Sequence, residues 1–152
     1  MQTEMKSVIQ PVESVSSWKE ARLLITDYFE SPPVVLKIED SIIGTLGNFS
    51  ASTGKAKSKK TFNLCAIVSS ALTNSTVLNY TSFLPIGKHK ILYVDTEQSP
   101  YHCLKVMTRI LRMAGLPDDR DNENLEFLAL RKYTPEQRIR IVEQAISNTP
   151  DI

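Results

Sequence analysis

The sequence predicts an α/β domain whose sheet is mainly parallel. Short apolar runs of strand length alternate with segments of helical periodicity along residues 34–152, and this alternation favours parallel strands joined by right-handed crossovers. A lysine-rich loop lies between the first predicted strand and helix, and a carboxylate-rich turn follows a later strand. Both features are expected at the carboxyl edge of the sheet, where open α/β proteins bind ligands.

The bulk composition is that of an ordinary globular domain. The chain has 152 residues, of which 41% are hydrophobic and 23% charged, with a formal net charge of +1. This length permits one domain with a core, and the overall charge identifies no partner. No apolar run approaches the ~20 residues of a membrane-spanning helix and no signal peptide opens the chain, so we expect a cytoplasmic protein.

Residues 1–33 are predicted to form a short N-terminal helix and a linker. Residues 18–29 carry Trp18, Leu23 or Leu24, and Tyr28 at helical spacing after a Ser-Ser pair suited to an N-cap. A Ser-Pro-Pro sequence then ends the helix. The main domain is expected to span residues 34–152.

The first strand and helix of the main domain flank the lysine-rich loop. Residues 34–52 supply one or two strands, of which Ile42–Ser52 is expected to be buried, and Thr61–Leu72 is a largely apolar helix. The loop departs by one residue from the phosphate-binding pattern Gly-x4-Gly-Lys-Ser/Thr. Its predicted phosphate-contacting residues are Gly54, Lys55, Ala56, Lys57, Ser58, Lys59, Lys60, Thr61 and Phe62.

Two registers of this pattern compete. In the first, Gly54, Lys60 and Thr61 match, and Lys59 stands where the second glycine is expected. The second uses Gly54 and Lys55 as the Gly-Lys pair and fails at two of four positions, so the first is favoured. Lys59 then requires a backbone conformation that is open to residues with a Cβ.

The residue types suit a triphosphate. Consecutive backbone N–H groups at a helix N-terminus bind anions, the Lys60 ammonium can reach the outer phosphates, and the Thr61 hydroxyl can hold Mg²⁺. The alternative is a solvated lysine-rich surface loop. No acidic residue lies between Asp40 and Asp95, which favours an anionic ligand, nucleotide first and nucleic acid second.

Further elements follow the loop helix. Residues 73–87 are predicted to be a connection, Lys90–Asp95 a strand covered on both faces, and Leu125–Leu130 another strand. Ser99-Pro100 opens a helix that closes at Gly115. A capping box at Thr134 opens the last helix. The apolar face of that helix is expected to comprise Ile139, Val142, Ala145 and Ile146.

Several charged residues on these elements are candidates for phosphate hydrolysis, metal binding or contact with a partner. Glu97 follows the strand that ends near Asp95, where it can position or deprotonate a water in line with the terminal phosphate. Asp95 is a candidate to hold Mg²⁺ through one of the ion's bound waters, or a helix cap. The alternative for Glu97 is an interaction with the helix dipole. Lys105, Arg109 and Arg112 share one helix side, which suits DNA, another subunit or solvent. Both cysteines are expected to be free and buried.

Three stretches carry a family resemblance: Leu46–Ser50, Gly54–Phe62 and Tyr93–Ser99. Together they resemble the RecA-like P-loop ATPases of bacterial mobile and conjugative elements, usually labelled AAA family ATPases or RepA-type helicases. The resemblance implies ATP and Mg²⁺ as cofactors, Lys60 and Glu97 as catalytic residues, and Thr61 and Asp95 at the metal. It also implies DNA as a candidate partner and a homo-oligomeric ring or filament.

The same resemblance implies a missing part. The family continues with a Walker B strand ending in aspartate, whereas this sequence ends at Pro150-Asp151-Ile152. We therefore expect a RecA-like core that is incomplete at the C-terminus, with weak nucleotide binding and little turnover. The alternative is a non-hydrolysing accessory or regulatory protein. A small-molecule kinase is less favoured because no Arg-rich lid segment follows.

Overall fold

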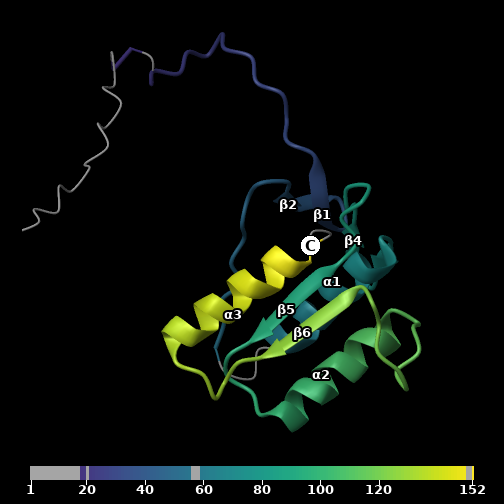
Figure 1. Cartoon of the computed structure of the whole chain (residues 1–152). Helices are drawn as coiled ribbons and strands as arrows, with labels where there is room; N and C mark the ends of the chain where they lie inside the picture. The colour runs from purple at the N-terminus through teal and green to yellow at the C-terminus, as the bar shows by residue number, and fades with distance from the viewer. Residues whose placement is uncertain (1–17, 20, 56–58, 150–151) are drawn as a thin grey trace, which may run out of the picture. The chain divides into compact units, whose positions relative to one another are not determined.

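The computed structural model describes residues 18–19, 21–55, 59–149 and 152 (Figure 1). The chain forms two compact units, Met1–Ser31 and Pro32–Ile152. The second unit is a mixed α/β domain that contains two sheets. One sheet is antiparallel and the other is a parallel pair.

The first unit contains no helix among its described residues. The helix predicted over residues 18–29 is replaced there by turns, closed by hydrogen bonds from Ala21 N to Trp18 O at 3.3 Å and from Asp27 N to Leu24 O at 3.0 Å. The expected Ser-Ser cap lies outside the described residues. Trp18 and Leu24 are exposed, and a helix this short is marginal in water unless its apolar face packs.

Four short strands form the antiparallel sheet in the order β2-β1-β4-β3. They are β1 (Val34–Ile38), β2 (Ser41–Thr45), β3 (Thr76–Val77) and β4 (Tyr80–Ser82). The β1–β2 hairpin turns at Glu39, whose φ is 51°. Glu39 N donates to Asn79 O at 2.8 Å, which ties this turn to the one between β3 and β4. Ile38 and Tyr80 lie opposite each other.

The parallel pair consists of β5 (Ile91–Asp95) and β6 (Leu125–Ala129), joined through α2 (Pro100–Met113). The two strands pair along their full length, from Ile91 opposite Leu125 to Asp95 opposite Ala129. Hydrogen bonds extend the ladder at both ends, including one from Leu130 N to Asp95 O at 2.7 Å. This β-α-β connection is the unit that the alternating pattern predicts.

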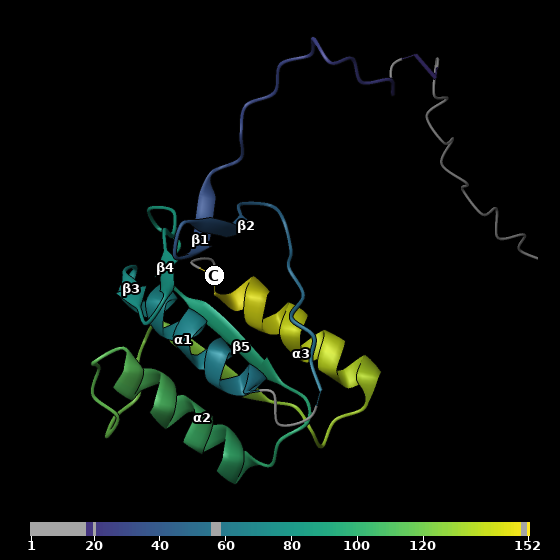
Figure 2. The ribbon, with the colours of Figure 1, turned by 180° about the vertical axis from the view of Figure 1, so that it is seen from behind.

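Helix α1 (Lys60–Thr73) lies beside α2 and in front of β5 in Figure 2. The two helices are joined by Ser69, whose buried hydroxyl lies 2.8 Å from Ile110 O of α2 and 2.7 Å from Cys65 O of its own helix. Helix α3 (Pro135–Asn148) lies beside β5, away from α2, in both views (Figures 1 and 2). The capping box at Thr134 is formed as predicted.

The core lies between α1, α2 and the parallel pair. Its buried cluster comprises Cys65, Val68, Tyr93, Val106, Ile110, Leu111 and Leu125. The rings of Tyr93 and Phe127 stack across the paired strands, with centroids 4.4 Å apart. Cys65 and Cys103 are free and buried, as predicted.

The larger sheet is antiparallel, which differs from the mainly parallel sheet that the sequence predicts. The strand expected over Ile42–Ser52 ends at Thr45, and residues 46–55 form a turn followed by irregular backbone. In that turn Gly47 has a φ of 79° and Asn48 N donates to Thr45 O at 3.2 Å. A left-handed glycine ends a strand readily. The strand before the loop belongs to the antiparallel sheet and does not pair with β5.

Three other differences concern the segment after α1 and the exposure of apolar residues on β5 and α3. Residues 73–87, expected as a connection, contain β3 and β4. Val94, expected to be covered on both faces of its strand, is 38% exposed. Ile139 and Ile146 of α3 are 60% and 50% exposed. Two strands provide too little surface to bury the whole apolar face of a helix of 14 residues.

Candidate functional site

Lys60 begins α1, and its side chain turns back toward the start of the lysine-rich loop. Lys60 Nζ donates to Gly54 O at 2.6 Å, so two fixed positions of the phosphate-binding pattern lie in direct contact. This contact closes a loop across a separation of six residues. The predicted loop residues Ala56, Lys57 and Ser58 lie outside the described residues.

Lys59 is the N-cap of α1 and has a left-handed backbone, with φ 60° and ψ 20°. The phosphate-binding pattern requires a backbone at Lys59 that is open to residues with a Cβ, and such residues adopt the left-handed region only at an energetic cost. The backbone at this position has the positive φ that glycine adopts without strain. The geometry at residue 59 thus suits the glycine of the pattern, although lysine occupies the position.

The start of α1 is electropositive. Its first turn contains no acidic residue, and Lys55, Lys59 and Lys60 are exposed. The first N–H groups of a helix have no intrahelical acceptor and lie at the positive end of the helix dipole. Thr61, next to Lys60, is half-buried, and Phe62 is exposed. The arrangement of backbone and side-chain charge is suited to an anion.

The Asp95–Gln98 turn is held by the Asp95 carboxylate. Asp95 is 8% exposed, and its Oδ1 accepts hydrogen bonds from Glu97 N at 2.9 Å and Gln98 N at 2.7 Å. Its Oδ2 accepts from Gln98 Nε2 at 2.8 Å. These hydrogen bonds hold the turn that precedes α2, whereas the N-cap of α2 is Ser99, so Asp95 is not the cap of this helix. Glu97 is exposed, so its carboxylate is accessible.

The start of α1 and the end of β5 lie at the same end of the second unit (Figures 1 and 2). This is the relative placement that the phosphate-loop hypothesis requires of Lys60 and Glu97. Among the described residues, no group of three or more His, Cys, Asp or Glu side chains could hold a metal ion. A Mg²⁺ ion that arrives with nucleotide needs few protein ligands, because phosphate oxygens and water complete its shell.

Arg109 lies close to the start of α1, although the two are about 50 residues apart in the sequence. Arg109 of α2 lines a pocket of about 430 Å³ together with Lys59 and Phe62. It also lies near Cys65: burial raises the pKa of this thiol, and the Arg109 guanidinium partly opposes the increase. The periodicity of α2 could place Arg109 on the polar side of the helix, but not beside α1, because helix packing is not encoded locally.

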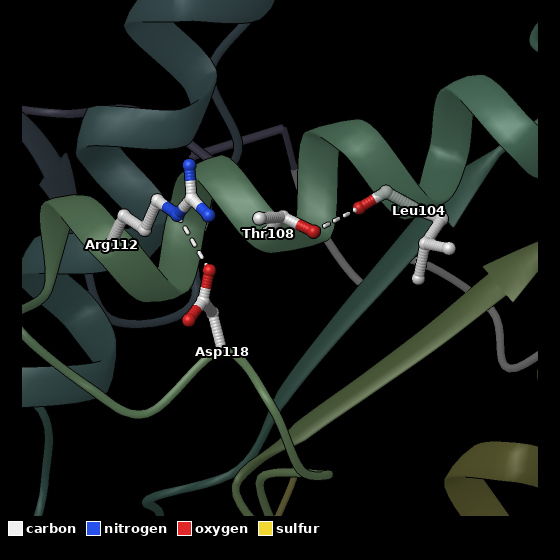
Figure 3. A network of polar contacts seen from close by, with 4 residues as sticks. All are labelled: Leu104, Thr108, Arg112 and Asp118. Carbon is white, nitrogen blue, oxygen red and sulfur yellow. Dashed lines mark hydrogen bonds and ion pairs between the residues drawn. The ribbon is translucent and has the colours of Figure 1, made fainter.

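The remaining cations of α2 have partners of their own. Figure 3 shows Arg112 in an ion pair with Asp118, at 2.5 Å between Nε and Oδ2. One turn earlier, Thr108 donates its hydroxyl to Leu104 O at 2.9 Å. Lys105 Nζ lies 5.5 Å from the centre of the Tyr101 ring. These contacts are those of a solvated helix face, and they leave the DNA hypothesis without specific support.

No protein-family model, curated protein or solved structure matches this chain. Within residues 18–19, 21–55, 59–149 and 152, no helix has the length and apolar character needed to cross a membrane.

Proposed function

We propose that this chain is the ATP-binding part of a RecA-like, DNA-associated P-loop ATPase of a mobile genetic element. The contact between Lys60 Nζ and Gly54 O is the observation that supports the proposal most. It keeps the Lys60 ammonium group beside Gly54, the first residue of the loop that precedes α1. An incoming phosphate can replace the carbonyl as the acceptor of that charge-assisted hydrogen bond.

In this proposal the loop binds the phosphates and Lys60 neutralises charge on the outer ones. The left-handed backbone at Lys59 turns the chain into the helix, so that the first N–H groups of α1 face the anion. The hydroxyl of Thr61 and the phosphate oxygens would hold Mg²⁺. When bound, Mg²⁺ neutralises negative charge that develops during phosphoryl transfer.

Glu97 is the proposed group that positions and deprotonates the attacking water. Its backbone N–H is held by Asp95 Oδ1 at 2.9 Å, which fixes the start of the turn while the Glu97 carboxylate stays accessible. Asp95 is therefore a positioning residue in this scheme. A carboxylate that orients a water adds to phosphoryl transfer mainly through geometry.

A second candidate is a nucleotide-binding accessory protein that does not hydrolyse ATP. The three hydrogen bonds that Asp95 already accepts favour it, because they leave this carboxylate less available to a metal ion. The two candidates share the phosphate loop. They differ in whether Glu97→Gln changes the rate of ATP hydrolysis.

Calorimetric titration with Mg²⁺ and ATP tests the proposal. Lys60→Ala should weaken ATP binding about tenfold or more, because it removes the ammonium that contacts Gly54 O at the start of the loop. Lys105→Ala is the matched control, since it removes the same charge from an exposed site on α2 and should leave affinity unchanged. Equal affinities for the two variants would contradict the proposal. Any DNA binding should weaken steeply with salt.

A further inference from the structure

A pocket of about 560 Å³ adjoins the start of α1. This volume is within the range of small-molecule sites, roughly 300–1,000 Å³. Three parts of the chain enclose it: α1, the antiparallel sheet and the segment that leads into the lysine-rich loop. The lining residues used below are Ile38, Ile43, Lys60, Thr61, Leu64 and Ile67.

Along α1, the side chains that line the pocket change from polar to apolar. Lys60 and Thr61 line it at the first turn of α1, whereas Ile67 lines it seven residues further along, which corresponds to about 10 Å at 1.5 Å per residue. Opposite the helix, the wall is formed by Ile38 and Ile43 of the antiparallel sheet. A ligand that fits both ends is anionic at one end and has a largely apolar body.

We infer that this pocket receives the base and ribose of the nucleotide whose phosphates bind the loop. The inference rests on the proposed function. It specifies a nucleoside triphosphate, in preference to inorganic polyphosphate, as the ligand of the site. A purine presents flat apolar faces to Ile43, Leu64 and Ile67. The hydroxyl groups of Ser50, Ser52 and Thr53 also line the pocket and can hydrogen-bond the ribose.

Neighbouring residues on β2 offer a matched test. Ile43 lines the pocket, whereas its neighbour Ile42 does not line it and is 55% exposed. The wild-type chain should bind ATP about tenfold more tightly than inorganic tripolyphosphate, each with Mg²⁺. Ile43→Ser should remove most of that difference without changing tripolyphosphate affinity, whereas Ile42→Ser should preserve it.

Two results would overturn the inference: equal affinity of the wild-type chain for ATP and tripolyphosphate, or equal ATP affinity of the Ile43→Ser and Ile42→Ser variants. Leu64→Ser, at a more exposed pocket residue, provides a second test if Ile43→Ser unfolds by circular dichroism. Failure of the phosphate site itself would appear differently, as tripolyphosphate binding that does not respond to Lys60→Ala.

Discussion

Replacing Lys59 by glycine should stabilise the fold. Lys59 has a φ of 60° and a ψ of 20°, a left-handed conformation that costs a residue with a Cβ about 1–2 kcal/mol. Glycine removes this cost but gives the unfolded chain extra freedom, which offsets about 0.4–1 kcal/mol. The net gain in the free energy of unfolding should be about 0.5–1 kcal/mol, or a rise in Tm of about 2 °C.

Urea denaturation and thermal melting measure this effect, with two controls. Lys59→Ala removes the same ammonium but keeps the Cβ, so the difference between the alanine and glycine variants isolates the backbone term. Lys55→Gly places glycine in the same loop at a residue without a positive φ, and should not stabilise. The reasoning is refuted if Lys59→Gly is no more stable than Lys59→Ala.

Two further predictions concern the core. Burial, with a smaller contribution from Asp95, raises the pKa of Tyr93 to about 12. Because the folded pKa lies above the unfolded value of about 10, the stability that neutral Tyr93 provides is complete below pH 10 and is lost as pH rises through 12. The loss should reach about 2 kcal/mol at pH 12 relative to Tyr93→Phe, measured by denaturation between pH 9 and 12. A stability difference between the two proteins that stays constant over this range would contradict the prediction. Ser69→Ala removes the hydroxyl contact with Ile110 O and should lower the free energy of unfolding by about 1 kcal/mol in urea. An unchanged midpoint would show that this contact does not stabilise the packing of α1 on α2.

Local signals in the sequence located the second half of the fold. The capping box at Thr134, the proline that begins α2 and the left-handed Gly115 act within a few residues, so helix boundaries could be predicted from them. The apolar run before Asp95 predicted β5, because this signal also lies within a few consecutive residues. Free, buried cysteines followed from their position on apolar helix faces.

Strand pairing could not be predicted in this way. A strand that pairs in parallel and one that pairs in antiparallel fashion share the same side-chain period, so Ile42–Ser52 carried no sign of its hairpin partner. The hairpin itself turns at Glu39 with positive φ, without the Asn-Gly or Asp-Gly signal of such turns. At the candidate site, the spacing of the phosphate-binding pattern identified Gly54 and Lys60 in the sequence. The proximity of Arg109 to Lys59 and Phe62 could not be predicted, because it depends on how α1 and α2 pack.

Backbone amide NMR during a titration with Mg²⁺ and ATP tests the central claim most directly. The account predicts that the largest shift changes occur at residues 54–62, with smaller changes at residues 95–98, and that Lys60→Ala abolishes both. Unchanged spectra at saturating ATP, or changes confined to a surface remote from the start of α1, would contradict it.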